Sequence, residues 1–164
     1  MITLGRRGGK TGDDVAMPVV HTDRGGLATY HGPGQLVGYL IIDVARRRMG
    51  PRRLVDALEA GIIRWLDTIG IEARSRRDAP GVWVDDQKIA ALGLHFSRGV
   101  SMHGFALNLE VDLTAYRAIT PCGFDPSQVT SVRAIRGGRW RVLDNATAVG
   151  HCVRDAILKR SLAP

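Results

Sequence analysis

RGGLATYHGPGQLVGYLIIDV, residues 24–44, is the stretch that decides the predicted fold. Its second half, residues 36–44, is an almost continuous apolar run, and its length and β-branched content favour a buried central strand. Its first half has four glycines and one proline in twelve residues. Such a composition lets backbone N–H groups come close to a ligand. The stretch therefore predicts a functional loop that leads into the middle of a sheet.

After this strand the hydrophobic period changes to that of a helix. Pro51 is a suitable first helical residue, and Gly70 stands where a C-terminal cap is expected. Between them apolar side chains recur at spacings of three and four, namely Leu54, Leu58, Ile62, Trp65, Leu66 and Ile69. The pattern predicts an amphipathic helix.

The remaining segments are predicted to be strands and shorter helices. Residues 18–23 predict a short strand before the loop, residues 81–96 a hairpin, and residues 102–109 a further strand. Residues 113–119 predict one or two helical turns, and residues 145–162 a closing helix. Because strands and helices do not alternate regularly, we expect an α+β (mixed α/β) fold with one central sheet flanked by helices.

The composition is that of an ordinary soluble domain. Its 164 residues suit one compact domain, and 45% of them are apolar. No apolar stretch reaches the ~18 residues that a membrane helix needs, and the N-terminus lacks the apolar run of a secretory signal. We therefore expect a cytoplasmic protein. The net charge of +7, from 20 Arg and 3 Lys, could attract a nucleic acid or an acidic protein.

Of the two cysteines, Cys122 is the candidate nucleophile. It stands between Pro121 and Gly123, which favour a sharp turn that presents the sulfur on a loop. Two isolated cysteines form neither a disulfide framework nor a four-ligand zinc site, so no metal is expected. The alternative for Cys122 is a small buried hydrophobic residue. For Cys152, on the apolar face of the closing helix, that structural role is the prediction.

Lys88 is the candidate partner of that thiol. Only a thiolate attacks, and an ordinary cysteine has a pKa of about 8.5, so a nearby cation is needed at neutral pH. The chain uses Arg almost everywhere, yet it keeps Lys88 at the start of an apolar strand. Lysine can lose its proton, whereas arginine effectively cannot. The alternative is an exposed lysine in the turn after Asp85 and Asp86.

The glycine-rich loop offers Arg24, Tyr30 and His31 as polar groups for a ligand. It lacks the Gly-Lys-Ser/Thr ending of the phosphate-binding loop, which disfavours a nucleoside triphosphate pocket of that kind. His103 is a second polar histidine, at the start of a strand. Each histidine alone could be structural.

Together these segments resemble the octanoyltransferases of lipoate biosynthesis, also called lipoate-protein ligase B or lipoyl(octanoyl) transferase. The resemblance runs from about Thr3 to Val132. It rests on motifs that follow the order of that family, namely Arg24–Gln35, Pro80–Val84, Lys88–Gly93, His103–Asn108, Pro121–Gly123 and Val129–Ser131.

The resemblance implies a fold similar to the biotin/lipoate ligase catalytic domain, a mixed sheet with helices on one side. It implies that Cys122 carries the acyl group as a thioester and that Lys88 lowers the pKa of its thiol. His103 would support the site, and backbone N–H groups near Gly93 or Gly104 could form an oxyanion hole. The implied acyl-binding residues are Arg24, Gly25, Gly26, Leu27, Ala28, Thr29, Tyr30, His31, Ala91, Leu92, Gly93, Gly104, Phe105 and Ala106.

The resemblance also implies partners. Octanoyl-acyl carrier protein would be the donor, and the lysine of a lipoyl domain, in 2-oxoacid dehydrogenases or the glycine cleavage H protein, would be the acceptor. The net charge of +7 suits acidic partners of this kind. We expect no cofactor, no nucleic acid, no membrane partner and a monomer.

Two departures from the family pattern concern the start of the chain and Leu40. Family members carry a helix and a strand before the segment seen here at Thr3–Arg6, so residues 1–164 are expected to be a single catalytic domain that apparently lacks both. Leu40 stands where the family favours proline. Three alternatives stay open: an ATP-dependent lipoate or biotin ligase, an Arg-rich nucleic-acid binder, and a truncated non-catalytic relative that only binds lipoyl domains.

Overall fold

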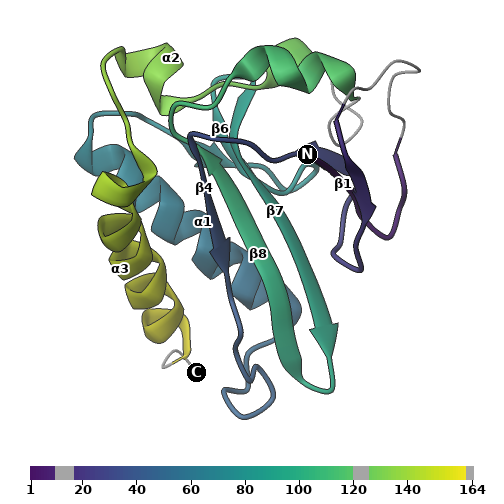
Figure 1. The fold of residues 1–164 in the computed structure, drawn as a ribbon. Coiled ribbons are helices and arrows are strands. Elements are labelled where there is room, and N and C mark those ends of the chain that lie inside the picture. The colour runs from purple at the N-terminus through teal and green to yellow at the C-terminus, as the bar shows by residue number, and fades with distance from the viewer. Residues whose placement is uncertain (10–16, 120–125, 162–164) are drawn as a thin grey trace.

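A computed structural model describes residues 1–9, 17–119 and 126–161. Two sheets stand side by side in it (Figure 1). The smaller has the order β2-β1-β3, with β1 parallel to β2 and antiparallel to β3. Its strands are β1 (Ile2–Leu4), β2 (Val19–His21) and β3 (Ala28–Tyr30).

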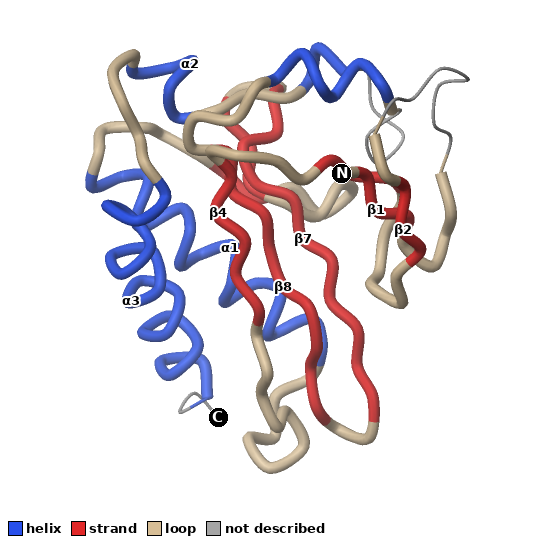
Figure 2. The backbone as a smooth tube through the Cα atoms, viewed as in Figure 1, coloured by secondary structure: helices blue, strands red, loops and turns tan. Residues whose placement is uncertain are grey.

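The larger sheet is antiparallel and has the order β4-β8-β7-β6-β5. Its longest pair, β7 and β8, forms the hairpin that crosses the middle of the molecule (Figure 2). Its turn lies at Arg98 and Gly99, between the end of β7 and the start of β8. The strands are β4 (Gln35–Tyr39), β5 (Arg74–Ser75), β6 (Val82–Val84), β7 (Gln87–Ser97) and β8 (Val100–Asn108).

Two long helices, α1 (Pro51–Thr68) and α3 (Val142–Ser161), pack against each other and cover one face of the larger sheet (Figure 1). Shorter helices connect the rest, namely η1 (Leu113–Ala118), η3 (Pro126–Gln128) and α2 (Val132–Arg136). The predicted α+β fold with helices on one side is confirmed, although the strands form two sheets instead of one. No helix of the described segments is long and apolar enough to cross a membrane.

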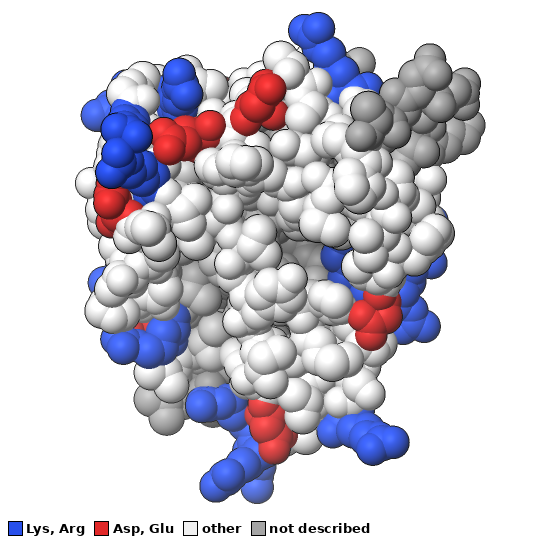
Figure 3. All heavy atoms as spheres, viewed as in Figure 1, with Lys and Arg blue, Asp and Glu red and all other residues white. Residues whose placement is uncertain are grey.

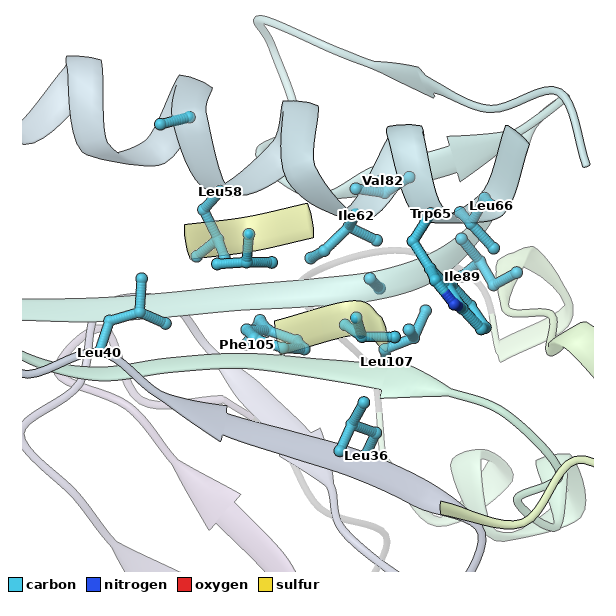
Figure 4. Close-up of a cluster of buried hydrophobic side chains, with 14 of the residues drawn as sticks. Leu36, Leu40, Leu58, Ile62, Trp65, Leu66, Val82, Ile89, Phe105 and Leu107 are labelled. Atoms are coloured by element: carbon cyan, nitrogen blue, oxygen red, sulfur yellow. The ribbon is translucent and has the colours of Figure 1, made fainter. Parts of the chain in front are cut away.

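The apolar spacing of α1 explains its place in the fold. Leu58, Ile62 and Trp65 point from the helix toward Phe105 and Leu107 on the sheet (Figure 4). Burial of each such side chain stabilises the fold by about 1.5–3 kcal/mol. The helix begins with Pro51 at its first turn and gives way at Gly70, whose φ is +73°. A second, smaller cluster joins the small sheet to η1 and consists of Ile2, Leu4, Ala28, Tyr30, Val111, Tyr116 and Ile119.

Gly61 lets α1 and α3 touch along their backbones. A Cβ atom at Gly61 would lie 2.6 Å from the Cα of Val153 and 3.0 Å from the carbonyl oxygen of Cys152. We expect Gly61→Ala to force the helices apart and to lower the free energy of unfolding by about 2 kcal/mol, as overpacking does. Gly150→Ala is the matched control, since Gly150 lies on α3 with nothing within 4 Å of its added Cβ.

Urea denaturation followed by circular dichroism measures both variants. Gly150→Ala is expected to raise the midpoint, because alanine is favoured over glycine in a helix by up to about 1 kcal/mol. An equal rise of the urea midpoint in Gly61→Ala and Gly150→Ala would contradict the close contact at Gly61.

The prediction of a buried central strand at residues 36–44 is wrong. The strand ends at Tyr39, and β4 is an edge strand that pairs with β8 alone among the described strands. Helices cover only one of its faces, so Leu36 and Leu40 are buried while Tyr39 is 70% exposed and Ile41 68% exposed. Beyond Tyr39 the regular register ends near His103, whose φ of +59° interrupts the extended conformation of β8.

Other elements agree with the prediction to within a few residues. The predicted hairpin of residues 81–96 is present as β6 and β7, and the further strand is β8. The short helical segment at 113–119 and the helix from Pro51 are also present. The closing helix starts at Val142, three residues before its predicted start. The sequence did not predict β1, β3, β5 or α2, which have two to five residues each and are too short to show a period.

Candidate active site

A narrow cavity lies between the small sheet and the open face of the large sheet. Its volume is about 50 Å³, well below the roughly 300 Å³ or more of common ligand pockets. Gly93 lets the glycine-rich loop lie close against β7, because a Cβ there would meet the Arg24 side chain and the Gly25 carbonyl at 3.0 Å. The lining residues are Arg24, Thr29, His31, Val37, Tyr39, Ala91, Leu92, Gly93, His103, Gly104, Phe105 and Ala106.

Arg24 is buried and forms part of the cavity wall. Its Nη2 donates to the Thr3 carbonyl at 2.7 Å and to Thr3 Oγ1 at 2.9 Å, and its Nε donates to the same hydroxyl at 3.2 Å. Nη1 donates to the Gly25 carbonyl at 3.0 Å. These hydrogen bonds tie the glycine-rich loop to β1. Arg24 therefore fixes the shape of the wall in addition to lending it a positive charge.

His31 lies on the same wall and is held by Gln35. Its Nδ1 is 2.8 Å from Gln35 Oε1, which makes Nδ1 the donor and leaves Nε2 as an acceptor. The Gln35 amide nitrogen in turn donates to Asn108 Oδ1 at 2.9 Å and to the Tyr116 hydroxyl at 3.0 Å. Burial lowers the pKa of His31, and the hydrogen bond with Gln35 opposes this in part. A neutral imidazole is thus favoured beside the cavity.

His103 also lines the cavity, and its ring contacts Asp23. Its Nε2 is 2.5 Å from Asp23 Oδ1, and His95 Nε2 lies 3.7 Å from the other carboxylate oxygen. The hydrogen bond with His103 lowers the pKa of Asp23. The pair links the loop before Arg24 to the β7–β8 hairpin. No group of three His, Cys, Asp or Glu in the described segments could hold a metal ion.

Lys88 is buried at the start of β7. Its Nζ donates to the Pro80 carbonyl at 3.1 Å and lies 4.8 Å from the centre of the Trp83 ring. The Arg76 guanidinium lies 4.7 Å from the same ring. An exposed turn position, the alternative from the sequence, is therefore wrong for this lysine. Burial of an ammonium requires polar partners of this kind.

Cys122 lies outside the described residues, so its position relative to Lys88 stays a prediction. The structure describes the chain again from Pro126 onward, and residues 127–130 contact the start of β7. The Thr130 N–H donates to the Lys88 carbonyl at 3.0 Å, and Val129 forms a parallel bridge with Lys88. Gln87 Nε2 donates to the Ser127 carbonyl at 2.9 Å. Cys152 is half-buried on α3 and packs against the main core.

The structure places only part of the predicted acyl-binding set around the cavity. Nine of its fourteen members line the cavity, namely Arg24, Thr29, His31, Ala91, Leu92, Gly93, Gly104, Phe105 and Ala106. Ala28 and Tyr30 are buried in the smaller core instead. The remaining predicted residues, Gly25, Gly26 and Leu27, do not appear in the lining. Substrate binding by any of these residues stays a prediction.

Two lining residues, Val37 and Tyr39, were not predicted from the sequence. They belong to the apolar run that was assigned to a buried strand. Successive side chains of a strand point to opposite faces, so Val37 and Tyr39 lie on the face opposite to the buried Leu36 and Leu40. The uniformly apolar run gave no signal for which of its faces is open.

Comparison with known proteins places this chain in a family. The family model of the lipoyl protein ligase A/B catalytic domain matches residues 12–153. The chain belongs to this family. The resemblance seen in the ordered sequence motifs is thereby confirmed.

The curated relatives that this chain matches include octanoyltransferases. The chain is 49% identical over 122 residues to the octanoyltransferase of Marinomonas sp. (strain MWYL1), with 74% of this chain and 57% of that protein covered. It is 50% identical over 121 residues to the octanoyltransferase of Pseudomonas putida (strain W619), with 74% and 56% covered. The matched part of the chain thus spans just over half the length of these relatives.

Solved structures share the fold at low sequence identity. Lipoate-protein ligase A bound with ATP superposes with a TM-score of 0.67 at 13% identity, covering 97% of this chain and 68% of that one. Biotin protein ligase from Aquifex aeolicus gives a TM-score of 0.63 at 15% identity, covering 78% and 55%. These neighbours confirm the predicted lipoate/biotin ligase fold.

Proposed function

We propose that this protein is an octanoyl-[acyl carrier protein]-protein N-octanoyltransferase of lipoate biosynthesis. It takes octanoyl from acyl carrier protein onto Cys122 and transfers it to the lysine of a lipoyl domain. The observation that carries the proposal is that about half of the matched residues, over 121–122 positions, are identical to those of octanoyltransferases.

The surroundings of Lys88 support a role as partner of a thiol. Its ammonium is buried, and its backbone pairs with Val129 and Thr130, which follow Cys122 by only a few residues in sequence. A cation near a thiol lowers the pKa of that thiol, because it favours the anionic form. Lysine can also release and recover a proton during the reaction, which arginine cannot.

The proposed reaction has two balanced steps. In the first, the Cys122 thiolate attacks the octanoyl thioester, and the departing carrier thiolate takes a proton from the Lys88 ammonium. In the second, the acceptor amine attacks the Cys122 thioester while the neutral Lys88 amine takes a proton from it. An amide forms and Cys122 leaves as thiolate, so the resting ion pair is restored. Because the first step exchanges one thioester for another, no ATP is required.

The charge distribution supports acidic protein partners. Figure 3 shows the open face over β4, β8 and β7, whose centre is hollowed and nearly bare of charged side chains, while Lys and Arg, with fewer Asp and Glu among them, lie around its rim. The net charge of the chain is +7. A basic rim steers an acidic partner toward the face, and this effect weakens as salt rises.

Intact-mass spectrometry tests the proposal. We expect incubation with octanoyl-acyl carrier protein, without ATP, to add one octanoyl group to the chain. Hydroxylamine should remove the group, as it cleaves thioesters, and an added lipoyl domain should take it up. Octanoate with ATP is the matched alternative donor, which an ATP-dependent ligase would use. An adduct or lipoyl-domain product seen only with octanoate and ATP would overturn the proposal in favour of a ligase.

A further inference from the structure

One peptide unit connects a buried carboxylate to the candidate catalytic lysine. The carbonyl of Pro80 accepts a hydrogen bond from Lys88 Nζ at 3.1 Å. The N–H of Gly81, in the same peptide unit, donates to Glu59 Oε1 at 2.9 Å. The peptide is trans, so its C=O and N–H point in opposite directions and the two charged groups lie on either side of it.

The Pro80–Gly81 peptide has little freedom to move. Gly81 has a φ of +139°, and a Cβ there would lie 2.7 Å from the Ala90 carbonyl oxygen and 3.1 Å from the Lys88 side chain. Just before it, the Ala79 carbonyl accepts a hydrogen bond from Trp83 Nε1 at 2.9 Å. The turn is thus fixed by β6 on one side and by Glu59 on the other.

Glu59 lies on α1 and is buried, with a relative exposure of 2%. Burial raises the pKa of its carboxyl, whereas the Gly81 N–H and the charges of Arg52 and Lys88 oppose this rise. Asp56, one turn earlier, acts in the same direction as burial. The polar groups that share its pocket at the surface are Arg52, Asp56, Ser75, Arg77 and Arg160.

A carboxylate on the N–H side of a peptide polarises that peptide. It makes the carbonyl oxygen on the other side a stronger acceptor, because linked hydrogen bonds reinforce one another in a low dielectric. A stronger acceptor favours the donor in its charged form. Removal of the negative charge should therefore weaken the hold on the ammonium even when the hydrogen bond geometry is kept.

We propose that Glu59 is a positioning residue for Lys88, which acts through the Pro80–Gly81 peptide to fix the ammonium and to favour its charged form. The inference rests on the proposed function only where it gives Lys88 a role in catalysis. The link itself concerns two described side chains and the peptide between them.

Titration of the lysine side chains by NMR tests the link directly. The chain has only three lysines, so protein carrying ¹³C at lysine Cε gives three signals, and a Lys88→Met variant assigns the one of interest. In Glu59→Gln, which keeps the volume and an oxygen acceptor, we expect the pKa of Lys88 to fall by about one unit. Lys10 and Lys159 should titrate as in the parent protein.

Asp67→Asn is the matched control, because it removes one negative charge from an exposed position on the same helix. It should leave the Lys88 titration unchanged. The parent protein supplies a test that needs no variant. Its Lys88 signal should show a second, acidic transition as Glu59 takes up a proton, and Lys10 and Lys159 should lack it.

An unchanged Lys88 pKa in folded Glu59→Gln would overturn the inference, as would the lack of an acidic transition in the parent protein. Neither measurement depends on acyl transfer. Failure to form an octanoyl adduct would refute the proposed function while leaving these titrations to decide on Glu59.

Discussion

Replacement of Cys122 by serine is expected to abolish the octanoyl adduct and to lower transfer to a lipoyl domain by roughly a thousand-fold or more. A serine hydroxyl is not ionised at neutral pH. It is much less acidic than a thiol, so a lysine that activates a thiol would not deprotonate it well enough to make it a nucleophile. Intact mass after incubation with octanoyl-acyl carrier protein measures the adduct, and the mass of the lipoyl domain measures transfer.

Cys152→Ser is the matched control for this change. Cys152 is the other cysteine of the chain and packs on α3 against the main core, so its replacement should leave the adduct in place. An adduct that persists in Cys122→Ser and disappears in Cys152→Ser would show that Cys152 carries the acyl group, and it would contradict the prediction. Equal adducts in both variants would place it on a residue other than cysteine.

Replacement of Lys88 by methionine is expected to slow the reaction of Cys122 at neutral pH by about 10–100-fold. An adjacent ammonium lowers the pKa of a thiol, so its removal raises that pKa, by roughly one to two units for a close pair. The fraction of thiolate at pH 7 falls in proportion. Methionine keeps most of the length and volume of the buried side chain, which limits the structural cost.

The pH dependence of alkylation by iodoacetamide measures this shift, in a Cys152→Ser background where Cys122 is the only thiol. Lys88→Arg separates the two roles of the residue. It keeps a positive charge, so the adduct should still form, but arginine cannot take a proton from the acceptor amine, so transfer should slow. An alkylation profile that is unchanged in Lys88→Met would remove this lysine from the mechanism.

Regular patterns made much of this fold predictable. The spacing of Leu58, Ile62 and Trp65 identified α1, and the shorter period of residues 81–96 identified the hairpin of β6 and β7. The edge position of β4 was not predictable in the same way, because an apolar run has the same composition whether one of its faces is covered or both. Which strand lies at an edge depends on pairing between distant segments.

The candidate site was predictable where a residue type carried its own signal. Lys88 stood out as a rare lysine before an apolar strand, and its burial agrees with that reasoning. Glu59 gave no such signal, since a single acidic residue in a helix with many charged positions resembles a solvated one. Its place between Leu58 and Ile62, on the buried side of α1, was the only clue.

The open edge of β4 has a consequence for how this chain behaves among copies of itself. The edge carries Val37 and Tyr39 and continues to Ile41, all of them exposed, beside the groove that β4 forms with α3. An unpaired apolar strand is a template for foreign chains, and proteins usually guard such strands with lysine or proline. No lysine or proline lies between Gln35 and Ile42. We therefore expect self-association of this chain, in concentrated solution or in partly folded molecules, to begin at this strand.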